Sequence, residues 1–124
     1  MKLLSHNMLT SNMIKGVKDG YPLGLIVKNF KSNELDYDES LIKKLIPKLC
    51  WKTFISASKC IKPETGLPEE LPKDYENNES FLKMAYKYLI NVEIVDGEMK
   101  CPQTGHVFPI ENGIPNMLIN KDKE

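Results

Sequence analysis

The sequence predicts an α+β protein in which both ends of the chain build one small β unit around an inserted helical lobe. In the middle of the chain, apolar residues recur with the period of a helix, and the period of a strand returns after residue 91. Neither end alone holds enough strands to bury a sheet face, because isolated two-stranded hairpins are marginally stable. We therefore predict a β unit from residues 1–33 and 91–124, with a helical lobe at residues 34–90.

The N-terminal part of the chain is expected to supply strands. Residues 2–9, KLLSHNML, are compatible with a short strand. Residues 23–30, LGLIVKNF, favour a strand more clearly, because the β-branched pair Ile26 and Val27 follows a Tyr-Pro start.

Three amphipathic helices are predicted between residues 36 and 90. The first begins near Asp36, which resembles a capping box with Glu39, and Pro47 either ends it or begins the next helix. The second covers residues 48–60. The third is capped by Asn77 or Asn78 and carries the clearest apolar stripe, formed by Phe81, Leu82, Ala85, Tyr86, Leu89 and Ile90.

Two hairpins are predicted after residue 91. Residues 92–101, VEIVDGEMKC, contain Asp96-Gly97, which is typical of a two-residue type I′ turn. Residues 106–115, HVFPIENGIP, place a second turn at Asn112-Gly113. The economical arrangement pairs the N-terminal strands with these hairpins in one sheet.

Composition narrows the class of protein. The 124 residues include 17 basic and 17 acidic ones, and this balance disfavours a chain whose affinity comes from neutralising phosphates. The chain has only three cysteines, an odd number, which disfavours a disulfide framework and indicates a reducing compartment. No apolar run approaches the ~20 residues of a membrane helix, and His6 and Asn7 interrupt any signal-peptide core. We expect the cytosol or the nucleus.

The stretch CPQTG, residues 101–105, looks like half of a metal-binding knuckle. Cys101 stands alone, and Thr104 occupies the position of the second cysteine. A structural zinc site needs four nitrogen or sulfur ligands. Free cysteines in helices ordinarily pack as small apolar side chains, so we expect no bound zinc. The residues that could otherwise complete such a site are His6, Cys50, Cys60 and His106.

The sequence does not favour catalysis. Cys101 could be drawn as a nucleophile with His6 or His106 as its base, but nothing supplies an oriented third group or an oxyanion site. No glycine-rich turn opens a helix, so we expect no cofactor site in this chain.

The apolar C-terminal segment, residues 107–119, leaves two interpretations open. Its apolar side chains either form an interface, as exposed patches tend to do, or pack on the helical lobe. Pro109 and Pro115 prevent continuous strand pairing, so we expect the segment to end in an irregular edge.

Four stretches, MKLLSHNML, IPKLCW, YENNESFLK and CPQTGHVFPIENGIPNML, resemble in the same order the multifunctional methyltransferase subunits of eukaryotes. These are small activator subunits shared by methyltransferases of tRNA, rRNA and translation release factor. The resemblance implies a zinc-ribbon-like β domain formed by both termini, with an inserted helical lobe. Many members bind zinc through four cysteines. Here only Cys101 is kept, while Thr104 and residues around Ser11 and Gly16 replace the others, so we expect a metal-free site.

The resemblance also implies a non-catalytic role. Members form heterodimers with Rossmann-like methyltransferases, which bind S-adenosylmethionine themselves, and they make these enzymes soluble and active. RNA and release factor would be reached only through the partner, in the cytoplasm and nucleus. The rival interpretation is a stand-alone zinc-ribbon-like RNA-binding module, which the neutral charge and missing ligands disfavour.

Residues at both ends are expected to face the partner. His6 and Asn7 have an equally good alternative as solvent-facing strand residues, and Gly113 is expected to serve its turn. The residues that the resemblance places at the interface are Leu4, His6, Asn7, Met8, Phe108, Pro109, Ile110, Ile114, Pro115, Asn116 and Met117.

Overall fold

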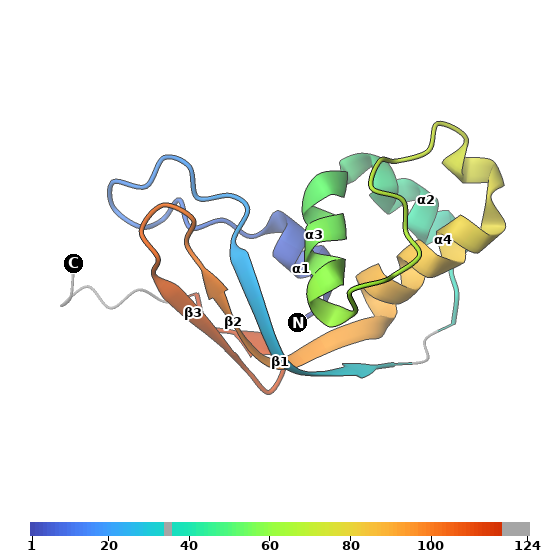
Figure 1. The fold of residues 1–124 in the computed structure, drawn as a ribbon. Helices are drawn as coiled ribbons and strands as arrows, with labels where there is room; N and C mark the ends of the chain where they lie inside the picture. Colours follow the sequence, from blue (N-terminus) through green and yellow to red (C-terminus); the bar gives the residue numbers. More distant parts are fainter. Residues whose placement is uncertain (34–35, 118–124) are drawn as a thin grey trace.

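A computed structural model describes residues 1–33 and 36–117 of the chain. A small antiparallel sheet lies at one end of the molecule and a group of helices at the other (Figure 1). Residues 34–35 and 118–124, which belong to the predicted segments, lie outside the described residues. Among the described helices, none is long and apolar enough to cross a membrane.

The sheet joins strands from both ends of the chain. Its order is β1-β2-β3-β4, and every neighbouring pair is antiparallel. This confirms the prediction that an N-terminal strand pairs with the C-terminal hairpin region. The strands are β1 (Gly24–Ser32), β2 (Val92–Lys100), β3 (Val107–Glu111) and β4 (Ile114–Pro115).

The predicted turn at Asp96-Gly97 is wrong, because β2 runs straight through it. Gly97 pairs with Val27, next to a register shift in β1. A Cβ atom at Gly97 would collide with the carbonyl oxygen of Ile26. This glycine therefore permits a close approach of two backbones at a bulge, and the long pairing of β2 with β1 overrides the local turn signal.

The second predicted turn, at Asn112-Gly113, is confirmed. It joins β3 to β4, and both residues have positive φ, 52° and 80° respectively. A type I′ turn requires this conformation at both central positions.

The strand predicted for residues 2–9 is also wrong. The chain forms α1 (Leu3–Met8), and only Lys2 makes a β-bridge, to Glu93. Leu3, His6 and Asn7 are buried, at the spacing of one helix face. Asn7 exchanges two side-chain hydrogen bonds with the backbone of Cys50, which hold α1 at the start of a later helix.

The predicted helical region is confirmed, with changes at its boundaries. Asp38, not Asp36, caps the first helix by accepting a hydrogen bond from the Leu41 backbone N–H. Asn78 caps the last helix by accepting from the N–H of Phe81. The helical elements are α2 (Glu39–Leu45), η1 (Ile46–Lys48), α3 (Trp51–Ile61), η2 (Tyr75–Asn77), α4 (Glu79–Tyr86) and the π-helical η3 (Lys87–Asn91), which runs directly into β2.

One apolar core serves both the sheet and the helices. Helix α3 packs against β1, and α1 packs against α3 and η3. From the strands, Ile94, Met99, Phe108 and Ile110 are almost completely buried, and from the helices so are Ile42, Phe54, Leu82 and Leu89. The inner face of β3, with Phe108 and Ile110, is therefore part of the core. Of the two interpretations of the C-terminal segment, packing inside the molecule holds for these two side chains.

Candidate partner-binding edge

The β3–β4 hairpin forms one edge of the sheet and carries an open groove. In the described residues, β4 has β3 on one side and no strand on the other. The backbone N–H of Asn116 donates to the carbonyl of Pro109, at an N–O distance of 2.9 Å, and keeps the chain beside β3 after β4 ends. The groove has a volume of about 410 Å³ and is lined by Pro109, Glu111, Ile114, Pro115, Asn116 and Met117. We call these six residues the hairpin groove; all except Glu111 were predicted to face a partner.

Ile114 is the most exposed apolar side chain of this groove. It is 69% exposed, although it sits directly after a tight turn in a β-strand. Its cross-strand partner is Glu111, which places a carboxylate at the rim. An isoleucine left open to water beside an unpaired strand edge is the kind of surface that another chain covers.

Two of the predicted C-terminal contacts lie on the other face of β3. Phe108 is 0% exposed and Ile110 is 1% exposed, so both side chains point into the core. They support the hairpin from beneath and do not form part of the exposed groove.

The predicted N-terminal contacts lie on α1 rather than on a strand. The imidazole Nε2 of His6 is bonded to the Leu23 carbonyl oxygen at 2.8 Å, and burial lowers the pKa of this histidine despite that bond. His6 and Asn7 are both buried, so the expectation of solvent-facing strand residues is wrong for them. Leu4 is half-buried against the core, and Met8 is 52% exposed at the end of α1.

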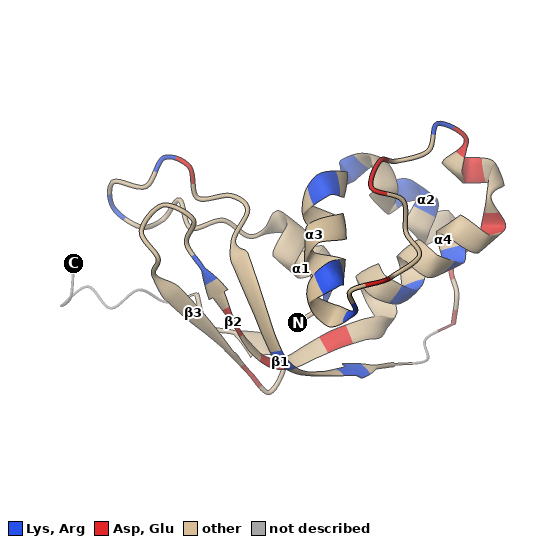
Figure 2. Cartoon of the chain, viewed as in Figure 1, with Lys and Arg blue, Asp and Glu red and all other residues tan. Residues whose placement is uncertain are grey.

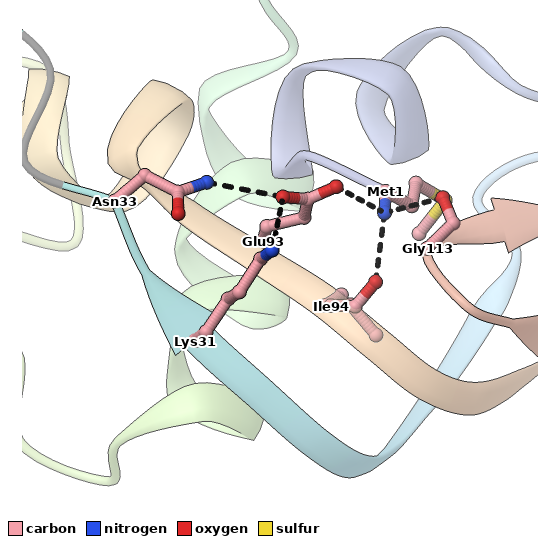
Figure 3. A network of polar contacts seen from close by, with 6 residues as sticks. All are labelled: Met1, Lys31, Asn33, Glu93, Ile94 and Gly113. Atoms are coloured by element: carbon pink, nitrogen blue, oxygen red, sulfur yellow. Dashed lines mark hydrogen bonds and ion pairs between the residues drawn. The ribbon is translucent and has the colours of Figure 1, made fainter.

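Met1 also contributes to the edge, and sequence reasoning missed it. Its α-ammonium nitrogen donates to the carbonyl oxygens of Ile94 and Gly113, each at 2.7 Å (Figure 3). Glu93 lies beside them, with its Oε1 4.0 Å from the same nitrogen. We call these four residues the amino-terminal junction. The only hint in the sequence was Gly113, the glycine of the turn. A hydrogen bond between two backbone groups leaves no side-chain pattern that sequence reasoning could detect.

The CPQTG stretch, residues 101–105, forms a second contact with the start of the chain. The backbone N–H of Thr104 donates to the Cys101 sulfur at 3.3 Å. Burial raises the pKa of this thiol, but hydrogen bonds from Ser11, from the side chain and backbone of Thr104 and from the backbone of Gln103 bring it down to about 7. We call Ser11, Gly16, Cys101, Gln103 and Thr104 the knuckle junction.

The knuckle junction does not have the ligands of a structural zinc site. One thiol and two hydroxyls stand where four nitrogen or sulfur donors are needed. His106 is exposed, and its ring packs edge-on against Phe108 at a centroid distance of 4.8 Å. Within residues 1–33 and 36–117, no group of three or more His, Cys, Asp or Glu side chains is placed to hold a metal ion.

These features define a class of protein: a small α+β subunit whose sheet ends in an open edge beside an exposed apolar groove. The chain belongs to the Trm112p-like protein family, whose model matches residues 2–113.

Relatives with the same overall length support this assignment. The chain is 35% identical to the multifunctional methyltransferase subunit TRM112-like protein of Mus musculus, over 99% of this chain and 98% of that one. It is 36% identical to TRM112 homolog A of Arabidopsis thaliana, over 99% of both chains. It is 22% identical to TRM112 of Saccharomyces cerevisiae, over 96% of both.

A solved structure shares the fold. A chain in the Mtq2–Trm112 complex of E. cuniculi matches with a TM-score of 0.60 and 18% identity, covering 95% of each chain. That complex is described as responsible for the methylation of the eRF1 translation termination factor.

Proposed function

We propose that this chain is a non-catalytic subunit that activates and stabilises S-adenosylmethionine-dependent methyltransferases of tRNA, rRNA and translation release factor. The observation that carries the proposal is the open β4 edge with Ile114 exposed in the hairpin groove. The names of the relatives and of the Mtq2–Trm112 complex agree with it.

Strand addition is the proposed mode of binding. A partner strand laid along β4 would gain main-chain hydrogen bonds, while the groove takes an apolar side chain next to Ile114. Pro115 has no backbone N–H, so only a short stretch of a partner strand could pair with the open edge of β4. Apolar contact must therefore supply much of the affinity. A permanent interface of this kind buries roughly 2,000 Å² or more.

Activation then needs no catalytic group in this chain. Covering an unpaired edge of the enzyme prevents its aggregation, and a subunit that binds only the folded enzyme stabilises it. If the covered state is also the one that binds S-adenosylmethionine, a larger competent fraction raises the apparent affinity for the cofactor. The cofactor itself would be held by the partner.

The charges are arranged in a way that disfavours the RNA-binding alternative. Basic and acidic side chains are both distributed over the helices (Figure 2). Several of them pair, as in the Lys43–Glu39 and Lys83–Glu79 ion pairs. A surface that holds a phosphate backbone has an excess of basic groups, which the net charge of zero does not provide.

The proposal extends to organisation and location. We propose that the two ends, 1–33 and 91–124, are a zinc-ribbon-like unit that works without metal, and that residues 34–90 are its insertion. In support, every strand of the sheet lies in the former and α2–α4 lie in the latter. The described cysteines are free, which agrees with a cytoplasmic and nuclear protein.

Affinity purification of the tagged chain from its own cell tests the proposal. We expect one-to-one complexes with Rossmann-like methyltransferases, whose activity is lost when the subunit is removed. Metal analysis of the same complexes should find no zinc bound by this subunit. Recovery of RNA without any methyltransferase would favour the RNA-binding module instead.

The hairpin groove is tested by one substitution and a matched control. Ile114→Asp places a charge in the groove and should weaken partner binding at least about tenfold, because a desolvated unpaired carboxylate is costly. Leu41→Asp makes the same change at a 38% exposed leucine of α2, in the helical part of the molecule. Equal binding by both variants would show that the interface lies elsewhere.

A further inference from the structure

The α-ammonium of Met1 is a buried charged group that the proposed function does not use. Met1 is only 5% exposed, and its nitrogen makes two 2.7 Å hydrogen bonds, to Ile94 and Gly113. Bonds of this length are typical of charged donors. The third proton has the carboxylate of Glu93 beside it, at 4.0 Å (Figure 3).

Met1 extends the sheet at the place where β3 ends. β3 pairs with β2 only from Gly97 to Lys100. At the next positions of β2, the N–H of Gly113 donates to the Val95 carbonyl, and the N–H of Ile94 donates to the Met1 carbonyl. The first residue of the chain is thus paired with β2 in both directions and bonded to the turn that precedes β4.

The carboxylate of Glu93 supplies a negative charge beside this ammonium. A hydrogen bond from Asn33 lowers the pKa of Glu93, and Lys31 and the ammonium itself lower it further. Burial lowers the pKa of the Met1 amine, and Glu93 raises it back in part. Lys31 Nζ lies 3.8 Å from the same carboxylate, so Glu93 links β1, β2 and the N-terminus (Figure 3).

Only a free amine can make these contacts. In acylation by a thioester, the amine nitrogen bonds to the acyl carbon, the thiolate leaves, and the ammonium loses two protons. The resulting amide has one N–H, so Ile94 or Gly113 would lose its donor, and the positive charge would be gone. Added atoms would also have to enter a buried place, since Met1 is only 5% exposed.

We propose that the free α-ammonium of Met1 anchors the Asn112–Gly113 turn, and that Nα-acylation, or a residue added before Met1, releases the β3–β4 edge. The consequence for methyltransferase binding rests on the function proposed above, whereas the release of the turn does not. Modification of the α-amine would therefore act on the binding edge from the far end of the sequence.

The anchor is tested without substitutions, because Cys50 permits ligation of a synthetic segment of residues 1–49 to the rest of the chain. The segment is made with a free or an acetylated α-amine. In the acetylated chain we expect the amides of Gly113 and Asn116 to exchange with solvent at least about tenfold faster. The Phe54 amide, bonded within α3 to the Cys50 carbonyl, should be unchanged. Equal protection at Gly113 in both chains would overturn the proposal.

Amine reactivity covers the case in which the acetylated chain does not fold. The unmodified chain is treated with a limiting acylating reagent, folded and in urea, and each amine is followed by mass spectrometry. We expect the Met1 amine to react at least about tenfold more slowly in the folded chain, because its protons are buried and bonded. Labelling at the same rate in both states would refute the anchor.

Partner binding separates this inference from the proposed function. With a captured methyltransferase, the acetylated chain should bind at least about tenfold more weakly than the free-amine chain. A released turn with unchanged affinity would support the anchor and contradict the placement of the interface on the β3–β4 edge. Protection and affinity that are both unchanged would overturn the anchor alone.

Discussion

The amino-terminal junction and the knuckle junction both tie the start of the chain to its C-terminal hairpin region, but with different chemistry. At the knuckle junction, the side chain of Gln103 bonds to the loop that precedes β1. Its oxygen accepts from the backbone N–H groups of Lys18 and Asp19 at 3.0 and 3.1 Å. Its amide nitrogen donates to the Gly16 carbonyl at 3.2 Å. These three hydrogen bonds of Gln103 are exposed and neutral, whereas the Met1 ammonium is charged and buried.

This difference indicates which hydrogen bonds hold the two ends of the chain together more strongly. Exposed neutral hydrogen bonds compete with water and contribute little net stability, while charge-assisted bonds to buried groups contribute more. We therefore infer that the bonds of the Met1 ammonium couple the two ends of the chain more strongly than the bonds of Gln103 do.

Alanine at two turn glycines gives the largest expected effect and isolates crowding at the amino-terminal junction. Gly113 and Gly105 have nearly equal φ, +80° and +79°, so the backbone strain of an added Cβ is the same. At Gly105 this Cβ would meet nothing within 4 Å, but at Gly113 it would lie 3.0 Å from Glu93 Oε1. We expect Gly105→Ala to lower the free energy of unfolding by about 1 kcal/mol and Gly113→Ala by about 2–3 kcal/mol.

Urea unfolding of both variants measures this difference. Because the backbone term is matched, Gly105→Ala is the control, and the excess at Gly113 reports the crowding at the amino-terminal junction. Equal losses would mean that this junction yields easily to an added atom and is not the stronger of the two.

A local cause accounts for the turn that the sequence predicted correctly. The turn at Asn112-Gly113 needs two positive φ angles, and the sequence Asn-Gly meets that need by itself. Asp96-Gly97 has the same local preference, but eight of the nine residues of β2 pair with β1 across a bulge, and that pairing decides the outcome. Residues 2–9 contain a helix whose buried side chains, Leu3, His6 and Asn7, have helical spacing. The segment is too short and mixed for its sequence to show that these three residues are the buried ones.

The candidate site was predictable where side-chain chemistry marks it. Ile114 and Met117 are apolar residues among prolines, and the structure places both in the hairpin groove. Phe108 and Ile110 look alike in the sequence, yet alternation along β3 turns them into the core. Met1 could not be found, because its role comes from its backbone nitrogen and from a partner 112 positions away.

Titration of the Cys101 thiol, in the knuckle junction, should make stability depend on pH. We expect this effect to be smaller than that of Gly113→Ala. The pKa of Cys101 is lowered from 9.0 to about 7, because the hydrogen bonds to its sulfur outweigh burial. A group whose pKa is lower in the folded state adds stability that is fully present above the unfolded pKa and is lost as the pH falls through the folded one. Stability should therefore rise by about 1–2 kcal/mol between pH 7 and pH 9.

Thermal or urea unfolding at these two pH values tests this in a chain carrying Cys50→Ser and Cys60→Ser. Adding Cys101→Ser to the same background removes only this titration, so the difference between the two chains isolates it. Ser11→Ala should raise the pKa of Cys101 and shrink the effect, since Ser11 is one of the donors. A pH profile that Cys101→Ser leaves unchanged would show that the thiol stays neutral.

Removing the glutamine of the knuckle junction gives the smallest effect. Gln103→Ala deletes three exposed hydrogen bonds, and we expect it to lower the free energy of unfolding by about 0.5–1 kcal/mol, because water replaces each bond. Gln103→Glu keeps the oxygen that accepts from Lys18 and Asp19 but loses the donor to Gly16, so its loss should be smaller. Amide exchange should quicken at Lys18 and Asp19 in the alanine variant and much less in the glutamate variant. If Gln103→Ala costs more than the excess of Gly113→Ala over Gly105→Ala, the exposed Gln103 bonds couple the two ends more strongly than the buried ammonium does, and the ranking drawn from charge and burial is wrong.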